Sequence, residues 1–393
     1  MTSPSFSALD AIRNSGIIIA SDGAEYKKIA KFDPVDATTN PSLTFAAVST
    51  PEYSHLLEDA VIYALTGNPS ATVEEQTELA LDHLLVHIGA EILSIIPGRV
   101  SISVDPRLGF SYSSILSKSR ALIKLVDELH IPRTRILVKI PATAEGIHAA
   151  HTLESNDGIH TNLTLVFSLV QAIACAQAGV TVISPFIGRV KDWWSARAVA
   201  AGVAEGIDDQ PLKEHPGIKL VYRIKEAYTR YGYCTQIMAA GFRKPEEIVE
   251  LSRFGSKGGP DLVTLPPELL EGLMRMDGGK NLGCDSRESV YSTDSSRSAP
   301  IYVTADGPTE EGFATFDRDS RQEAISLDKV PEGLAKFSVD AVKLEKTVRD
   351  MIEQFNEARL SDVESASTEV FKETVHRLSV GGGKVLRKSV SVN

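Results

Sequence analysis

The chain alternates short apolar segments with stretches of helical periodicity, and this alternation limits the folds that it can adopt. Eight segments have the composition of buried strands, at residues 16–21, 35–41, 100–106, 135–143, 161–167, 180–185, 233–240 and 262–265. Helical patterns follow these segments, and no tight hairpin turn joins one segment to the next. Strands separated by helices pair in parallel. The sequence therefore predicts a single-domain α/β fold, a (β/α)8 TIM barrel with additional terminal helices.

The predicted barrel occupies residues 1–360. Within it, residues from about 277 to 318 are rich in Gly, Ser and Asp and lack periodicity, which predicts an irregular excursion. A helix is expected to resume over 331–352 and to pack against the barrel. Residues 361–393 are expected to form a C-terminal extension that is first helical and then disordered.

Charge and composition exclude several classes of function. The net charge of −11 argues against a duplex nucleic-acid partner. The sequence has neither an apolar run of the roughly 20 residues that a membrane span needs nor the pattern of a signal peptide. Three cysteines, Cys175, Cys234 and Cys284, show no paired metal-ligand spacing and no even disulfide framework. We therefore expect a cytoplasmic protein with no metal site and no membrane contact.

Lys139 is an unusual residue for its surroundings, because it lies inside the β-branched run of the fourth predicted strand. Alternation along that strand would place Leu137 and Lys139 on one face and Val138 on the other. A buried ammonium needs a partner or loses its proton. The lysine is therefore either a structural residue that pairs with a carboxylate, or an amine whose depressed pKa makes it a nucleophile for carbonyl compounds.

Polar side chains gather at one end of the predicted strands. They lie at or just past the carboxyl-terminal parts of these strands: Asp22, Asn40, Asp105, Lys139, Asn162, Thr164, Ser184, Arg189 and Arg243. In (β/α)8 enzymes this end of the barrel carries the catalytic groups. The clustering favours the functional interpretation of Lys139.

Four motifs in this order, at residues 36–43 (DATTNPSL), 136–143 (ILVKIPAT), 162–164 (NLT) and 183–189 (ISPFIGR), resemble those of the transaldolase family. The resemblance implies a class I aldolase on a (β/α)8 barrel that works without metal or cofactor. Such an enzyme is a transferase that moves a dihydroxyacetone unit from a ketose phosphate to an aldose phosphate, as in the pentose phosphate pathway. Sugar phosphates would be its ligands, and family habit implies a homodimer.

The resemblance also assigns catalytic roles. Lys139 matches the Schiff-base lysine, Asp22 the acid/base aspartate and Thr164 the threonine that positions a catalytic water. An amine suits this chemistry because its iminium with a ketose is an electron sink for carbon–carbon cleavage, and a carboxylate takes the hydroxyl proton that cleavage releases. For Asp22, the sequence leaves open the plainer role of a turn or capping acid before Gly23.

The residues that the resemblance implies in substrate binding are Asn40, Asn162, Ser184, Phe186, Arg189 and Arg243. The amides and hydroxyl would hold the hydroxyls of the three-carbon unit, and the two guanidinium groups would bind phosphate. Alternative roles remain open for each kind of residue. The amides could bond to backbone in tight loops, the aromatic ring could be a packed core residue, and either arginine could belong to a surface ion pair.

Ser103 departs from the family pattern, which has a glutamate here that activates the water with the threonine. A serine can hold a water but cannot accept its proton near neutral pH. Ala144 and Gly241 also replace a tryptophan and a serine. The departures leave two alternatives to an ordinary transaldolase: an aldolase with an altered donor or acceptor and weak transfer activity, or a sugar-phosphate-binding protein with a decayed site.

Overall fold

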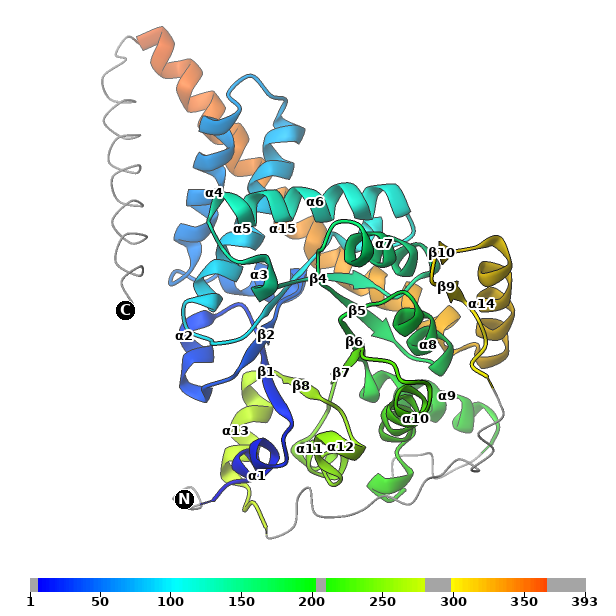
Figure 1. Ribbon diagram of the computed structural model, residues 1–393. Coiled ribbons are helices and arrows are strands. Elements are labelled where there is room, and N and C mark those ends of the chain that lie inside the picture. The colour runs from blue at the N-terminus through cyan, green and yellow to red at the C-terminus, as the bar shows by residue number, and fades with distance from the viewer. Residues whose placement is uncertain (1–5, 203–209, 280–297, 366–393) are drawn as a thin grey trace.

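The computed structural model describes residues 6–202, 210–279 and 298–365. Its centre is a closed barrel in which each strand pairs in parallel with the next, and β1 pairs with β8 (Figure 1). The barrel strands are β1 (Ile18–Asp22), β2 (Asp36–Thr38), β3 (Val100–Ser103), β4 (Ile136–Pro141), β5 (Thr161–Val166), β6 (Val182–Pro185), β7 (Gln236–Ala239) and β8 (Leu262–Leu265). The predicted (β/α)8 fold is confirmed.

Helices connect successive strands and surround the barrel (Figure 1). From the N-terminus to β5 they are α1 (Ala8–Asn14), α2 (Tyr26–Ile29), η1 (Ala30–Phe32), α3 (Pro41–Val48), α4 (Ser54–Gly67), α5 (Val73–Leu93), η2 (Pro106–Leu108), α6 (Tyr112–Glu128), η3 (Arg133–Arg135) and α7 (Ala144–Ser155). From β5 to β8 and just beyond they are α8 (Leu169–Gln177), α9 (Ile187–Ala200), η4 (Leu212–Glu214), α10 (Pro216–Tyr231), α11 (Pro245–Leu251), α12 (Gly255–Gly258) and α13 (Pro267–Arg275).

Local chemistry explains where helices begin and end. The long helix α5 starts after Thr72, whose hydroxyl accepts from the backbone N–H of Glu75 while the Glu75 carboxylate accepts from that of Thr72. Helix α10 ends at Gly232, which adopts the left-handed conformation at φ +70° that favours glycine. Such caps fix the helices that hold the barrel strands in place.

The barrel strands alternate between two apolar environments. A small inner cluster consists of Ala20, Leu137, Val182, Met238 and Leu262. Val138 and Ile140 instead belong to the large core between the barrel and its helices. The predicted alternation is thus confirmed, and it turns Lys139 toward the barrel interior together with Leu137.

Part of the excursion expected at about 277–318 is regular. Its described residues include the two-stranded sheet of β9 (Val303–Thr304) and β10 (Gly307–Pro308), and helix α14 (Glu310–Glu323) begins within it. Thr309 caps α14 by accepting from the N–H of Gly312. The expectation therefore extended the irregular segment too far toward the C-terminus. Residues 280–297 lie outside the described part of the chain.

Helix α15 (Ile325–Ser365) is longer than the helix expected over 331–352 and contains Pro331 in its interior. It contacts α3, α5, η2, β5 and α9. Three of these neighbours, α3, η2 and α9, directly follow the carboxyl ends of barrel strands. Helix α15 therefore crosses the carboxyl-end side of the barrel before it extends past α4 and α5 (Figure 1). The predicted boundary at residue 360 falls within this helix, and residues 366–393 of the expected extension are outside the described ranges.

Candidate active site

Lys139 is buried in the barrel interior, with 7% of its surface exposed. Its Nζ donates to the backbone carbonyl of Thr39, 3.1 Å away, from the loop that follows β2. Burial lowers the pKa of Lys139, because the ammonium loses its hydration, while the negative charge of Asp22 acts in the opposite direction. A lowered pKa increases the fraction of neutral amine, which is the nucleophilic form.

Asp22 ends β1 and is held from the neighbouring strand. The hydroxyl of Thr38 donates to Asp22 Oδ1 at 2.7 Å, and the hydroxyl of Thr264 on β8 lies 2.7 Å from that of Thr38. Because Thr38 gives its proton to the carboxylate, it accepts from Thr264. Sequence reasoning missed this relay, although Thr38 lies in the quoted 36–43 motif and its position on β2 beside β1 was predictable.

Ser103 is the neighbour of Lys139 across the β3–β4 pair. Its hydroxyl donates to the carbonyl of Thr39 at 3.3 Å, so it shares an acceptor with the Lys139 amine. The two side chains thus converge on one backbone oxygen. A carbonyl oxygen accepts hydrogen bonds but takes no proton near neutral pH, so this contact does not replace a carboxylate as a base.

Thr164 lies on β5 beside Pro141 of β4, and its buried hydroxyl has no hydrogen-bond partner in the described structure. The register with β6 shifts directly after it, at Leu165, which has a positive φ of 59°. A β-bulge of this kind redirects the chain at the rim of a barrel. The unpaired hydroxyl is consistent with the predicted role of holding a water or a ligand.

Asn162 and Ser184 form a buried polar contact between β5 and β6. The Ser184 hydroxyl donates to Asn162 Oδ1 at 2.8 Å, and Asn162 Nδ2 donates to the hydroxyl of Ser101 on β3 at 3.1 Å. Asn162 is only the second residue of β5, yet it pairs in register with Lys139 because strands in a closed barrel are staggered. The expectation that it lies near the carboxyl end of its strand is wrong, but it lies level with the lysine.

Asn40 and Phe186 show the plainer roles that the sequence left open. Asn40 caps α3, and its Oδ1 accepts from the N–H of Leu43 at 3.0 Å. Phe186 precedes α9 and packs at a tilt against Phe167, with ring centroids 6.2 Å apart. Both residues nevertheless follow the carboxyl ends of barrel strands, which leaves ligand contact open.

The two predicted phosphate-binding arginines approach the first turn of α9. Arg189 belongs to that turn, and Arg243 passes over Gly188, where an added Cβ would lie 2.6 Å from Arg243 Nε. Both are in ion pairs: Arg189 Nη2 lies 2.9 Å from Glu332 of α15, and Arg243 Nη2 lies 2.6 Å from Asp192 of α9. The structure therefore brings two cations to one helix N-terminus, a favourable environment for an anion.

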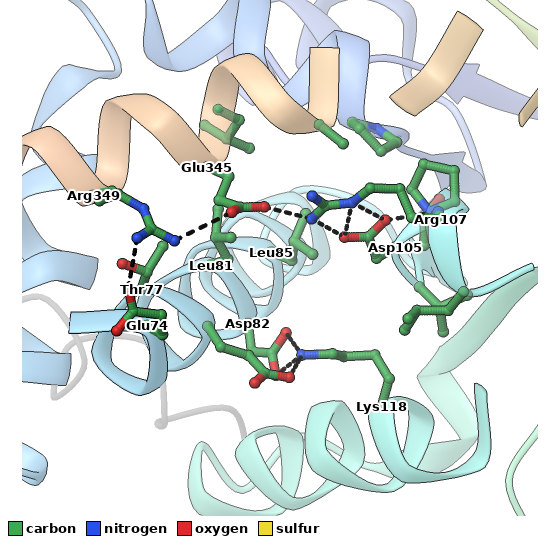
Figure 2. A pocket seen from close by; sticks show the side chains of 18 residues that line it. Glu74, Thr77, Leu81, Asp82, Leu85, Asp105, Arg107, Lys118, Glu345 and Arg349 are labelled. Carbon is green, nitrogen blue, oxygen red and sulfur yellow. Dashed lines mark hydrogen bonds and ion pairs between the residues drawn. The ribbon is translucent and has the colours of Figure 1, made fainter. Parts of the chain in front are cut away.

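A cavity of about 400 Å³ lies outside the barrel, between α5, η2, α6 and α15 (Figure 2). Ion pairs surround it, among them Arg107 with Glu345 at 2.6 Å and Lys118 with Asp82 at 2.8 Å. Of the polar residues that the sequence analysis singled out, Ser103 and Asp105 line it. This cavity is therefore not the space around Lys139, although it adjoins the altered position.

The described ranges contain no group of three or more His, Cys, Asp or Glu side chains that could hold a metal ion. Cys175 is buried and Cys234 is exposed, and both are free. In those same ranges, no helix is long and apolar enough to cross a membrane.

A (β/α)8 barrel with a buried amine, a carboxylate and polar side chains near the carboxyl ends of its strands has the architecture of a barrel enzyme. The family model for transaldolase and fructose-6-phosphate aldolase matches residues 19–348, and the chain belongs to this family. It is similar to the transaldolase of Saccharomyces cerevisiae, with 39% identity over 347 residues, which cover 88% of this chain and 95% of the yeast protein.

The similarity extends to animals and bacteria. The transaldolase of Sus scrofa is 39% identical over 345 residues, covering 88% of this chain and 94% of its own. The transaldolase of Gloeobacter violaceus is 39% identical over 347 residues, which cover 88% of this chain and 82% of the bacterial protein. The protein is accordingly an enzyme of the transaldolase type.

Proposed function

We propose that this enzyme transfers a dihydroxyacetone unit from a ketose phosphate to an aldose phosphate through a Schiff base on Lys139. The observation that carries the proposal is the buried amine with a lowered pKa, turned into a barrel together with Leu137 and subject to the charge of Asp22. Family membership supports the reaction type. The roles of individual residues are part of the proposal.

In the proposed reaction, the neutral amine of Lys139 adds to the ketose carbonyl, and the hydroxyl of the resulting carbinolamine takes up a proton from solvent and leaves as water, which gives a cationic iminium. Asp22 takes the proton of the C4 hydroxyl as the C3–C4 bond breaks, and the electron pair moves into the iminium. The aldose phosphate leaves and an enamine remains. Its carbon then attacks the acceptor aldehyde, Asp22 returns the proton to the new hydroxyl, and hydrolysis frees Lys139.

Thr38 supports the proton-transfer role of Asp22, because its hydroxyl donates to the carboxylate and fixes one oxygen. The other carboxylate oxygen would then take and return the proton. Thr164 would hold the water that enters and leaves during imine formation and hydrolysis, since its buried hydroxyl has no partner among the described residues.

We propose that Asn40, Asn162 and Ser184 hold the hydroxyls of the three-carbon unit and that Phe186 forms an apolar wall beside it. Asn162 and Ser184 lie in the buried polar layer of the barrel that includes Lys139. Their present hydrogen bonds join them to each other, so binding would require them to accept or donate to the substrate in addition. Asn40 would donate through its amide nitrogen, Nδ2, while its amide oxygen caps α3.

The phosphate groups would bind at the start of α9. Arg189 and Arg243 supply guanidinium groups that form paired hydrogen bonds with phosphate oxygens, and the helix N-terminus adds its partial positive charge. Asp192 and Glu332 currently pair with these arginines. The proposed ligands are therefore sugars that carry a terminal phosphate.

Ser103 favours a second candidate function, an aldolase of the same family with weakened or redirected transfer activity. Its neutral hydroxyl donates to the Thr39 carbonyl, and no carboxylate occupies its position. A binding protein with a decayed site is the third hypothesis, but the buried lysine beside Asp22 weighs against it. We also propose a homodimer located in the cytoplasm, for which family membership is the support.

A coupled assay with fructose 6-phosphate as donor distinguishes these functions. We expect release of glyceraldehyde 3-phosphate that depends on an acceptor. The rate with erythrose 4-phosphate as acceptor should be at least about tenfold higher than with erythrose, because charge-assisted hydrogen bonds hold its phosphate. Better turnover with unphosphorylated aldehydes would indicate a redirected aldolase. Substrate-dependent thermal stabilisation without any turnover would indicate a binding protein and would contradict the proposal.

A further inference from the structure

Glu332 of α15 joins three cations at one carboxylate. Its Oε1 lies 2.9 Å from Arg189 Nη2 and 2.8 Å from Lys336 Nζ, and its Oε2 lies 2.6 Å from Lys329 Nζ. Hydrogen bonds from Lys329 and Lys336, and then that from Arg189, lower the pKa of Glu332 to about 2. The carboxylate is therefore ionised at any physiological pH, and it bridges a cation of α9 to cations of α15.

Lys329 differs from Lys336 in its surroundings. The Lys329 side chain is only 15% exposed, close to the 12% of Arg189, whereas Lys336 is 69% exposed. An ammonium that is mostly removed from water needs strong partners. One shared carboxylate serves three cations here, so the cluster carries an excess of positive charge.

The face of α15 that carries Lys329 is turned toward the barrel. Gly333 lies one helical turn after Lys329 on the same face. An added Cβ at Gly333 would lie 2.7 Å from Arg189 Nη1 and 2.8 Å from the side chain of Leu165. Leu165 follows Thr164 at the bulge of β5. The start of α15 thus packs against the phosphate-binding arginine at the carboxyl end of the barrel.

The charge of the cluster matches a phosphate monoester. Arg189, Lys329 and Lys336 contribute three positive charges and Glu332 one negative charge, which leaves two positive charges. A phosphate monoester carries close to two negative charges at pH 7. Glu332 occupies one end of the Arg189 guanidinium, so the remaining N–H groups of that guanidinium stay available for phosphate oxygens.

We propose that Lys329 is a third cation of the phosphate site and that Glu332 is a positioning residue, which holds Lys329 beside Arg189. The inference rests on the proposed function, because that function places the substrate phosphate at Arg189. It means that α15, a helix from outside the eight β/α units, determines part of the selectivity for phosphorylated substrates.

The test compares a phosphorylated with an unphosphorylated donor. Lys329→Met is expected to raise the KM for fructose 6-phosphate about tenfold with little change in kcat, and to leave kcat/KM for fructose within about twofold. Lys329→Arg should restore most of the affinity. Glu332→Gln should raise the same KM several-fold, because Arg189 and Lys329 then repel each other without a shared carboxylate.

Asp328→Asn is the matched control, because Asp328 also links α15 to α9. It lies 3.3 Å from Arg197 and accepts from the indole N–H of Trp193 at 2.7 Å. We expect this variant to keep the ratio of the KM for fructose 6-phosphate to the KM for fructose. If it changed the ratio as much as Glu332→Gln does, the ion pairs would serve only to dock the helix, and the inference would be wrong.

Titration calorimetry with inorganic phosphate separates this inference from the proposed function, because it needs no turnover. We expect Lys329→Met to bind phosphate about tenfold more weakly than the wild-type enzyme does. Unchanged phosphate affinity in an enzyme that transfers the three-carbon unit would overturn the inference alone. Absence of transfer by the wild-type enzyme would instead overturn the proposed function.

Discussion

The hydroxyl of Ser103 and the amine of Lys139 donate to the same carbonyl oxygen, that of Thr39. This shared acceptor orients the amine, but it gives the site no base at position 103. Among the described residues, Asp22 is the carboxylate whose negative charge acts on the pKa of Lys139. In the mechanism that we propose, proton transfers to and from water during imine formation would proceed without a carboxylate at position 103, and we propose that this weakens transfer.

Ser103→Glu tests this weakness. In the proposed mechanism, a carboxylate at this position, paired with Lys139 across β3 and β4, would accept a proton from the catalytic water, so we expect transfer to rise about 10²-fold, the typical contribution of a positioned general base. Steady-state kcat with fructose 6-phosphate and erythrose 4-phosphate is the measurement.

Ser103→Gln is the control for that substitution, because it has the same shape without the basic oxygen. An equal increase in kcat for the glutamine variant would show that size, not basicity, limits the reaction. No increase for either variant would mean that the serine enzyme already transfers protons by another route.

Much of the site at the residue scale could be predicted from the sequence. Alternation within 136–140 was enough to predict that Lys139 faces away from Val138 and Ile140, which pack in the core between the barrel and its helices. The ion pair of Arg189 with Glu332 could not be predicted, since the partners are separated by 143 positions and meet only when α15 folds across the barrel. Periodicity describes local structure and carries no information on such distant pairs.

At the scale of elements, α5 and α6 are tied together by Lys118 and Asp82. The Lys118 ammonium lies within 2.8 and 2.9 Å of the two carboxylate oxygens, beside the cavity shown in Figure 2. Burial raises the pKa of Asp82 to about 6, against the opposing influence of Lys118. Between about pH 4 and pH 6 the folded protein binds this proton more tightly than the unfolded chain, so the contribution of Asp82 to stability falls as the pH rises.

Lys118→Met should therefore destabilise the enzyme in a pH-dependent manner. At pH 8 it would leave a buried carboxylate without its cation and lower the free energy of unfolding by about 3 kcal/mol. At pH 5 the loss should be smaller, because Asp82 without Lys118 is protonated and neutral. Urea unfolding at the two pH values measures both losses.

The exposed Lys124 of the same helix provides the comparison, and Lys124→Met should change stability by no more than about 0.5 kcal/mol. If Lys118→Met cost the same at pH 5 as at pH 8, the account of the buried charge would be wrong. A loss of packing by the lysine stem would then be the explanation, since packing does not depend on pH.

Elements with a clear apolar stripe were predictable, and elements without one were not. Helix α5 is of the first kind, because its leucines and isoleucines recur at helical spacing. Helix α14 was missed in part because it is mainly polar, and Gly312 and Ser320 are its buried residues. The N-terminal extension of α15 was missed because Pro331 is a common helix start, whereas here it lies in the helix interior.

For the whole molecule, the sequence predicted a closed barrel from eight strands without hairpins, and the topology confirms it. What the strand pattern could not predict is the path of α15, which leaves the β/α alternation and crosses the side that carries the site. A helix with an apolar face is expected to pack on the barrel, but periodicity does not say where. The barrel thus supplies the amine and the carboxylate, and α15 supplies charge to the same end.

The measurement that tests the central claim most directly is mass spectrometry after incubation with fructose 6-phosphate and borohydride. The account predicts a reduced three-carbon adduct on the peptide that contains Lys139, and none in Lys139→Met. Absence of the adduct from the wild-type enzyme, or an equal adduct in the Lys139→Met variant, would contradict it.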